Sequence, residues 1–121
     1  MSDYQAAAPL DQITPGQVHA VAFAGHMIGL TLLADGSPRA FQSLCPHDKA
    51  NLAGGRVEGC TLHCPRHFAR FDLDDGAVSA GWRIDDLKLY PARISAGQVE
   101  VDAAAVRANP PEGRKTVWIM G

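Results

Sequence analysis

Short runs rich in apolar residues, the first of them alternating with polar ones, fill the first part of the chain. Such runs span residues 18–23, 28–33 and 39–44, and turn-forming residues separate them at 24–26 and 35–38. A β-strand points successive side chains to opposite faces of a sheet, while Gly, Pro and Asp favour turns. The pattern therefore predicts three short strands, the last of which delivers Cys45 at its end.

The same pattern continues to residue 102. Further short strands are predicted at 60–63 and 68–71, and a closing hairpin is predicted from 89–94 and 98–101 around a turn at 95–97. No long segment with the 3.6-residue period of a helix precedes residue 103. Turn signals recur about every ten residues, which is typical of a small sandwich or barrel. We therefore expect an all-β, antiparallel fold.

The last part of the chain has a different character. Residues 103–107 could form a helical turn, and Asn109-Pro110-Pro111 would stop it. Residues 117–120 are apolar and include Trp118. We expect one β domain over residues 1–102 and a C-terminal extension over 103–121 that packs Trp118 on the domain, the less favoured alternative being a docking role for that extension.

Composition excludes several classes of function. The 121 residues carry a formal net charge of −2, 46% of them are hydrophobic and 20% are charged. No basic surface for nucleic acid, secretory signal or membrane-spanning run is indicated. Three cysteines are an odd number, and Cys60 has no evident partner, which favours a reducing cytoplasm and no disulfide.

Four residues with metal-binding side chains stand in two mixed pairs. Cys45-Pro46-His47 is followed sixteen residues later by Cys64-Pro65-Arg66-His67, so each pair holds one Cys and one His. A Rieske [2Fe–2S] cluster has two Cys ligands on one iron and two His ligands on the other. Two loops that each supply one Cys and one His can hold such a cluster from both sides. We therefore predict Cys45, His47, Cys64 and His67 as the ligands.

Two other interpretations use the same residues. Structural zinc also binds two Cys and two His, but zinc fingers usually group the two Cys and the two His separately, with the His pair on a helix. Cys60 and His63 form an overlapping C-x-x-H, yet in a strand they would point to opposite faces. We expect Cys60 to be a small buried residue, and His63, His19 and His26 to lie near the surface without a special role.

The chain resembles the Rieske-type ferredoxins of bacterial multicomponent oxygenases over roughly residues 10 to 102. The resemblance rests on the two mixed pairs and on Leu52-Ala53-Gly54-Gly55, Phe71-Asp72 and Leu89-Tyr90-Pro91-Ala92-Arg93. It implies a two-sheet antiparallel fold with a cluster-binding subdomain at one end. It also implies that the two Cys hold the inner iron and the two His the outer, solvent-facing iron.

The resemblance further implies a low redox potential. High-potential Rieske proteins have a loop disulfide and Ser and Tyr hydroxyls that donate hydrogen bonds to sulfur atoms, whereas this chain has Ala69 and Phe71 at the apparent hydroxyl positions and no additional loop cysteines. We expect a potential of about −100 to −150 mV, at the low end of the Rieske range. Phe68 replaces the glycine that usually follows the last ligand, which mildly favours ferredoxins of soluble diiron hydrocarbon monooxygenases.

The expected function is electron transfer and not catalysis. The protein would carry single electrons from an NAD(P)H-dependent flavoprotein reductase to the oxygenase of an alkene- or toluene-type monooxygenase. The alternatives are the ferredoxin of an aromatic-ring dioxygenase, the small electron-entry subunit of a nitrite reductase, and a zinc-binding structural module. Basic residues near the ligand pairs could form a rim for docking: Lys49, Arg56, Arg66 and Arg70. Acidic residues could gather elsewhere: Asp72, Asp74, Asp75, Asp85 and Asp86.

Overall fold

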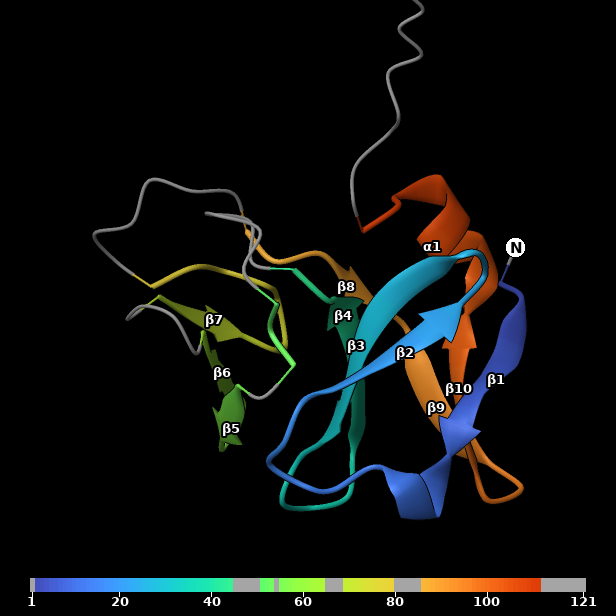
Figure 1. Cartoon of the computed structure of the whole chain (residues 1–121), viewed down its shortest axis with the longest axis horizontal. Coiled ribbons are helices and arrows are strands. Elements are labelled where there is room, and N and C mark those ends of the chain that lie inside the picture. The colour runs from blue at the N-terminus through green and yellow to red at the C-terminus, as the bar shows by residue number, and fades with distance from the viewer. Residues whose placement is uncertain (1, 45–50, 54, 65–68, 80–85, 112–121) are drawn as a thin grey trace, which may run out of the picture.

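The structure, a computed structural model, describes residues 2–44, 51–53, 55–64, 69–79 and 86–111 (Figure 1). Within these residues the strands form three antiparallel sheets, and the chain also has one short 3-10 helix and one α-helix. The antiparallel all-β prediction is confirmed.

Two of the sheets form what we call the base. One contains β1 (Tyr4–Pro9), β9 (Ala92–Ser95) and β10 (Gln98–Asp102) in the order β1-β10-β9. The other contains β2 (His19–Phe23), β3 (His26–Leu32), β4 (Pro38–Gln42) and β8 (Leu89–Tyr90) in the order β2-β3-β4-β8. The 3-10 helix η1 spans Leu10–Gln12 between β1 and β2.

The third sheet is smaller and lies to one side of the base in Figure 1. It contains β5 (Arg56–Glu58), β6 (Thr61–His63) and β7 (Arg70–Asp72), paired in sequence order. The backbone of residues 16–17 ties it to the base, because Val57 N donates a 2.9 Å hydrogen bond to Gly16 O and Gln17 pairs with Arg56. This arrangement matches the expected two-sheet fold with a subdomain at one end.

Each region has its own hydrophobic core. The base core includes Ile28, Leu30, Val99 and Val101, all of which are fully buried or nearly so. A second core, which we call the small-region core, consists of these buried residues: Val18, Leu33, Phe41, Leu52, Val57, Leu62, Cys64, Ala69, Phe71, Leu73 and Leu87. Because Phe41 comes from β4, the small sheet shares its core with one strand of the base.

Two tight turns explain the regularity of the base hairpins. Ala24 and Gly25 between β2 and β3 have φ values of 52° and 81°, and Ala96 and Gly97 between β9 and β10 have φ values of 51° and 76°. Two consecutive residues with positive φ are what a type I′ turn requires, and this turn matches the twist of the strands it joins. The turn at 24–25 is so short that β3 already begins at His26, which the sequence pattern placed in the turn.

The predicted strand over 89–94 is wrong as a single strand. The chain breaks at Pro91 into β8 and β9, which belong to different sheets. Proline has no N–H to donate to a ladder, so it suits the point where the chain leaves one sheet for another. Its carbonyl instead accepts a 3.0 Å hydrogen bond from Asp102 N.

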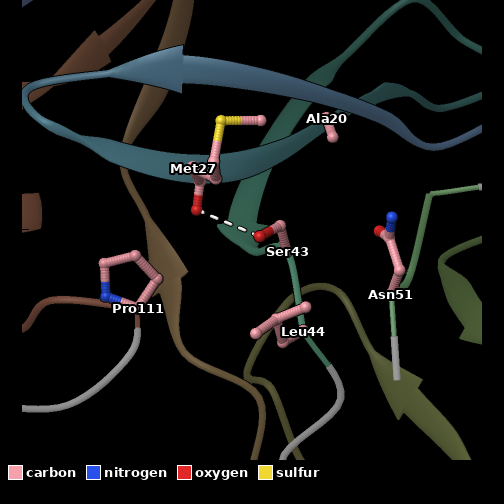
Figure 2. A pocket seen from close by; sticks show the side chains of 6 residues that line it. All are labelled: Ala20, Met27, Ser43, Leu44, Asn51 and Pro111. Carbon is pink, nitrogen blue, oxygen red and sulfur yellow. Dashed lines mark hydrogen bonds between the residues drawn. The ribbon is translucent and has the colours of Figure 1, made fainter. Parts of the chain in front are cut away.

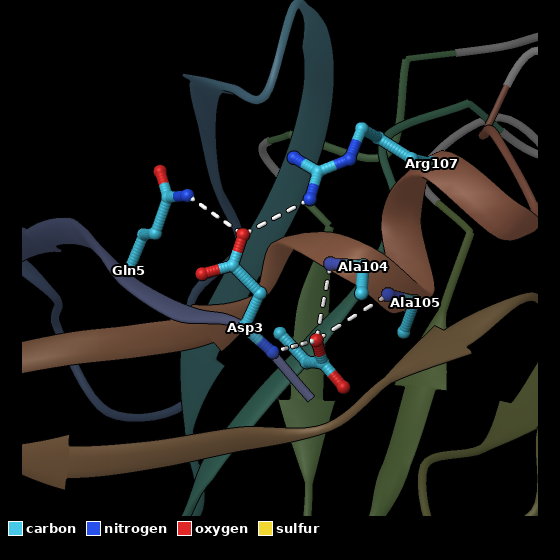
Figure 3. A network of polar contacts seen from close by, with 6 residues as sticks. Asp3, Gln5, Ala104, Ala105 and Arg107 are labelled. Carbon is cyan, nitrogen blue, oxygen red and sulfur yellow. Dashed lines mark hydrogen bonds and ion pairs between the residues drawn. The ribbon is translucent and has the colours of Figure 1, made fainter. Parts of the chain in front are cut away.

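The helix α1 (Ala103–Ala108) confirms the predicted helical turn. Asp102 caps it, with Oδ1 accepting hydrogen bonds from Ala104 N at 3.0 Å and Ala105 N at 3.4 Å. The same oxygen accepts the N–H of Asp3 at 2.8 Å, and the Asp3 carboxylate pairs with Arg107 at 2.9 Å (Figure 3). This network ties β1, β10 and α1 together, although the sequence pattern had not predicted β1.

Candidate metal centre

The first predicted ligand pair belongs to a loop whose two ends are fixed. Leu44 and Asn51 form an isolated antiparallel bridge, and Leu52 N donates a 2.8 Å hydrogen bond to Ser43 O. The six residues from 45 to 50 therefore leave and return at paired positions. Cys45 and His47 lie in this interval, outside the residues that the structure describes.

The second pair belongs to the connection between β6 and β7. His63 pairs with Arg70, and Cys64 N donates a 3.1 Å hydrogen bond to Ala69 O, so the hairpin register continues to the first ligand residue. Cys64 is 5% exposed. His67 lies beyond it in the interval 65–68, which is outside the described residues.

The bases of the two loops share one hydrophobic core. Leu52, directly after the first loop, and Cys64 and Ala69, at the ends of the second, all belong to the small-region core. The structure thus brings together the anchors of both ligand loops, although three of the four predicted ligands lie outside the described residues. Of the four, Cys64 is the one whose surroundings can be described, and it is buried at the end of the β6–β7 hairpin.

Apolar, buried side chains occupy positions 69 and 71, where hydroxyl groups that donate hydrogen bonds to sulfur atoms would be expected in a high-potential Rieske protein. Ala69 and Phe71 are both fully buried, and Phe71 pairs across the small sheet with Leu62. Neither side chain has a hydrogen to donate to a sulfur atom. Positions 69 and 71, which the resemblance to Rieske proteins singled out, therefore hold buried apolar groups.

Cys60 and His63 differ in their positions and in their contacts. His63 Nε2 lies 3.2 Å from Glu58 Oε1, on the solvent side of the small sheet. Cys60 is partly buried against the small-region core, where a small buried residue was expected. Gly59 and Cys60 form the two-residue turn between β5 and β6, and a turn position leaves one side of the thiol open.

The Cys60 thiol has acidic neighbours that the sequence analysis did not foresee. Burial, followed by a hydrogen bond to the Asp74 carboxylate, raises the pKa of Cys60, and the Arg39 guanidinium holds the pKa of Asp74 below its usual value. The Cys60 sulfur and one carboxylate oxygen each of Asp72 and Asp74 lie within 4.8 Å of one another. Asp74 is already paired with Arg39 at 2.9 Å, so this group is best described as a polar network. No spacing in the sequence could have indicated it, because the turn after β7 creates it.

The remaining histidines and charged residues have mainly structural contacts. His19 Nε2 accepts a 2.9 Å hydrogen bond from Thr14 N, which is a structural contact near the surface. Among the described basic residues of the predicted rim, Arg56 lies 3.2 Å from Glu58, and both side chains are exposed. The described acidic residues mostly accept backbone hydrogen bonds in turns, as Asp75 does from Ala77 N at 2.8 Å. Lys49, Arg66 and Asp85 lie outside the described residues.

Fold and loop anchors together define a small antiparallel β protein in which the anchors of the two segments that carry the Cys/His pairs share one core. Residues 3–91 match the family described as the Rieske [2Fe-2S] domain, and the chain belongs to this family. The ferredoxin component of the naphthalene 1,2-dioxygenase/salicylate 5-hydroxylase systems of a Ralstonia species is 36% identical over 88 residues, covering 73% of this chain and 84% of that protein.

Two solved structures show the same fold. The Sphingomonas yanoikuyae B1 ferredoxin is 27% identical with a TM-score of 0.73, covering 83% of this chain and 98% of that chain. A Mycobacterium tuberculosis protein described as an NADH-dependent nitrite reductase small subunit is also 27% identical, with a TM-score of 0.74, covering 84% of this chain and 95% of that chain.

Family membership settles the type of cofactor. It is the Rieske [2Fe–2S] cluster, as the mixed Cys/His pairs predicted, and not structural zinc. The relatives are named as ferredoxin components, which transfer electrons and are not the catalytic subunits of their systems. Within the described part of the chain, no helix is long and apolar enough to cross a membrane.

Proposed function

We propose that this protein is a Rieske ferredoxin that carries single electrons, in the cytoplasm, from an NAD(P)H-dependent flavoprotein reductase to the oxygenase component of an aromatic-ring dioxygenase system. The observation that carries the proposal is the match to ferredoxin components of such systems over most of both chains. The cytoplasmic assignment is supported by the odd number of cysteines, which leaves Cys60 without an evident partner outside the two Cys/His pairs.

Cys45, His47, Cys64 and His67 are proposed to hold the cluster, with the two Cys on the inner iron and the two His on the outer iron. The donor set fits, since it supplies the two thiolates and two imidazoles that a Rieske centre needs. The described anchors fit as well, because Cys64 is buried while both loops start from the same core. When bound, the cluster accepts and releases one electron.

The proposed potential is about −150 to −100 mV, within a Rieske range of about −150 to +300 mV. Hydrogen bonds to the sulfur atoms raise the potential of an iron–sulfur cluster, because they stabilise its more negative, reduced form. Ala69 and Phe71 supply no such bond from their side chains. A redox titration that gives a strongly positive midpoint would remove this part of the proposal.

The expected preference for an alkene- or toluene-type monooxygenase finds no support among the relatives, which are named for dioxygenase systems. That preference rested on Phe68, which lies outside the described residues. The dioxygenase, which was the alternative, is therefore the partner proposed here. A nitrite reductase partner remains the second candidate because of the fold and 27% identity shared with a nitrite reductase small subunit.

Reconstituted turnover separates these partners. The purified protein is mixed with NADH, a flavoprotein reductase and, in turn, a naphthalene-type dioxygenase, a toluene-type diiron monooxygenase and a nitrite reductase large subunit. We expect product formation with the dioxygenase that depends on this protein, and little with the other two. Turnover only with the monooxygenase or only with the nitrite reductase would replace the proposed partner but leave the electron-carrier function in place.

A further inference from the structure

An apolar groove lies on the base beside the first ligand loop. It has a volume of about 280 Å³ and lies between the β2–β3 hairpin, the end of β4 and Pro111, which follows α1 (Figure 2). Its lining residues are Ala20, Met27, Ser43, Leu44, Asn51 and Pro111. Leu44 and Asn51 are the pair that closes the loop carrying Cys45 and His47, so the groove adjoins the proposed cluster site.

The Ser43 hydroxyl and the Asn51 side-chain oxygen in this groove already form hydrogen bonds within the protein. Ser43 Oγ donates a 3.1 Å hydrogen bond to Met27 O, which Figure 2 shows, and Asn51 Oδ1 accepts the N–H of Ala53 at 2.9 Å. None of the lining residues is charged. A polar ligand would therefore find few partners here, whereas an apolar side chain would remove apolar surface from water.

Met27 makes this surface unusual for the molecule. Its side chain is 48% exposed, and among the described residues it and Ile94, at 42%, are the two large exposed hydrophobic residues. Ile94 stands on β9 and does not line the groove. Exposed apolar surface that adjoins a concave apolar lining is typical of a surface that another chain segment covers.

The chain itself provides an occupant that begins at the groove. Pro111 lines the groove, and residues 112–121 follow it directly. The segment contains Gly113, where the chain can reverse direction, and then the apolar run of residues 117–120. The seven residue-to-residue steps from Pro111 to Trp118 can span up to about 25 Å when extended. A short tether of this kind gives an effective concentration in the millimolar range.

We propose that residues 112–121 fold back over the base and that Trp118, with its apolar neighbours, fills the groove and covers Met27. The chain thereby covers its own apolar surface next to the first ligand loop. A partner that approached this loop over Leu44 and Asn51 would meet the folded-back segment. The inference does not depend on which oxygenase or reductase the protein serves.

Trypsin reports on this contact because it cuts after Arg114 and Lys115, three and two residues before Val117. Cleavage of full-length protein with its cluster bound is followed by intact mass, with a synthetic peptide of residues 109–121 as the reference for an undocked segment. When opening and closing are faster than cleavage, the rate tracks the fraction of open segment. We expect slow cleavage of the wild type relative to the peptide.

Four variants test the groove and the segment against each other. Met27→Glu places a charge in the groove and Trp118→Ser removes the main apolar side chain, and each should speed cleavage about ten- to a hundredfold, the range that corresponds to loss of one buried hydrophobic side chain. The double variant should be cleaved little faster than either single variant, because both remove the same contact. Ile94→Glu is the matched control and should leave the rate unchanged. Retained cluster absorbance shows that each variant is folded.

Three outcomes would overturn the proposal. The wild type could be cleaved as fast as the peptide, which would mean that the segment is not docked. Met27→Glu and Trp118→Ser could have additive effects, which would mean that they act at different places. Finally, an occupant other than the chain itself could provide the protection. Protection that rises with protein concentration together with dimer formation would indicate a second copy, and protection that appears only when the oxygenase is added would indicate that partner.

Discussion

The base and the small region of this protein are built on different principles. The base has strands of up to seven residues, hairpins with type I′ turns and a core formed by strands on both sheets. The small sheet has three strands of three residues each, and most of its buried side chains come from loops and turns around it. Short three-residue strands gain little from their ladder and need packing or another constraint.

This difference indicates how stability and function are divided. We expect the base to keep its own packing without the cluster, whereas the small region, which anchors both proposed ligand loops, should owe part of its stability to the cluster. A cofactor that binds the folded state and not the unfolded state stabilises the protein by mass action. The cluster is therefore expected to stabilise the small region as well as to serve as the redox centre.

The largest expected effect comes from replacing Cys64, the one proposed ligand among the described residues. Cys64→Ser should abolish cluster binding, because a proposed inner thiolate ligand is lost, and should loosen the small region while the β-structure of the base persists. Visible absorbance and iron content report on the first effect, and circular dichroism with limited proteolysis reports on the second. Cys60→Ser is the matched control and should retain the cluster. If Cys60→Ser loses the cluster and Cys64→Ser keeps it, the ligand assignment is wrong.

A smaller effect is expected at a glycine in the small region. Gly76 has a φ of 79°, and a Cβ there would overlap the carbonyl oxygen of Leu87, which also lies close because Leu87 N donates a 2.8 Å hydrogen bond to Gly76 O. Gly76→Ala should lower the free energy of unfolding by about 2–4 kcal/mol, from the positive φ and the overlap together.

Gly97 in the base provides the comparison, because its φ is 76° and nothing lies within 4 Å of its Cβ position. Gly97→Ala should therefore lower the free energy of unfolding by only about 1–2 kcal/mol. Urea denaturation of both variants measures the difference. Equal losses would show that the overlap at Leu87 is relieved without cost.

The cap of α1 tests the base by itself. Asp102→Ala removes the acceptor for Ala104 N, Ala105 N and Asp3 N, and should lower the free energy of unfolding by about 1–2 kcal/mol. Asp102→Asn keeps an acceptor oxygen and should lose much less. Because the change lies far from the ligand loops along the fold, the midpoint potential of the cluster should be unchanged. A shifted potential would show that the two regions are coupled more tightly than their separate cores suggest.

The smallest effect concerns the thiol at the outer turn of the small sheet. Burial and the hydrogen bond to Asp74 raise the pKa of Cys60, while the charge of Arg39 opposes them. Asp74→Asn should lower this pKa, so at a given pH more thiolate forms and iodoacetamide reacts faster. Arg39→Gln should raise the pKa and slow the reaction. Rates measured by mass spectrometry between pH 7 and pH 10 test both signs, and two shifts in the same direction would contradict the described network.

The type of cofactor was easier to predict from the sequence than the paths between elements. The mixed Cys/His pairs indicated a Rieske cluster, which family membership confirms, because the types and spacing of residues are local properties of the chain. The assignment of Cys45, His47, Cys64 and His67 as its ligands stays a prediction. β1 was missed because Ala6, Ala7 and Ala8 give no alternation, and its pairing with β10, including a bulge between Ala6 and Ala8, depends on a partner strand far along the chain.

Other features arise only from tertiary structure. The break at Pro91 depends on which sheet each half-strand joins, and the meeting of Cys60 with Asp74 depends on how β7 and its following turn fold back. The two loop anchors, Leu44–Asn51 and Cys64–Ala69, are likewise pairings that residue types alone do not specify. Local chemistry was therefore predictable, and nonlocal pairing was not.

The most direct test of the central claim is the metal content and electron paramagnetic resonance of the purified protein. Two iron atoms and two sulfide ions per chain are expected, together with visible colour and a Rieske-type signal after reduction. In Cys64→Ser the iron, the colour and the signal should all be lost, while Cys60→Ser should keep them. A colourless wild-type protein that holds zinc and gives no signal after reduction would contradict the account.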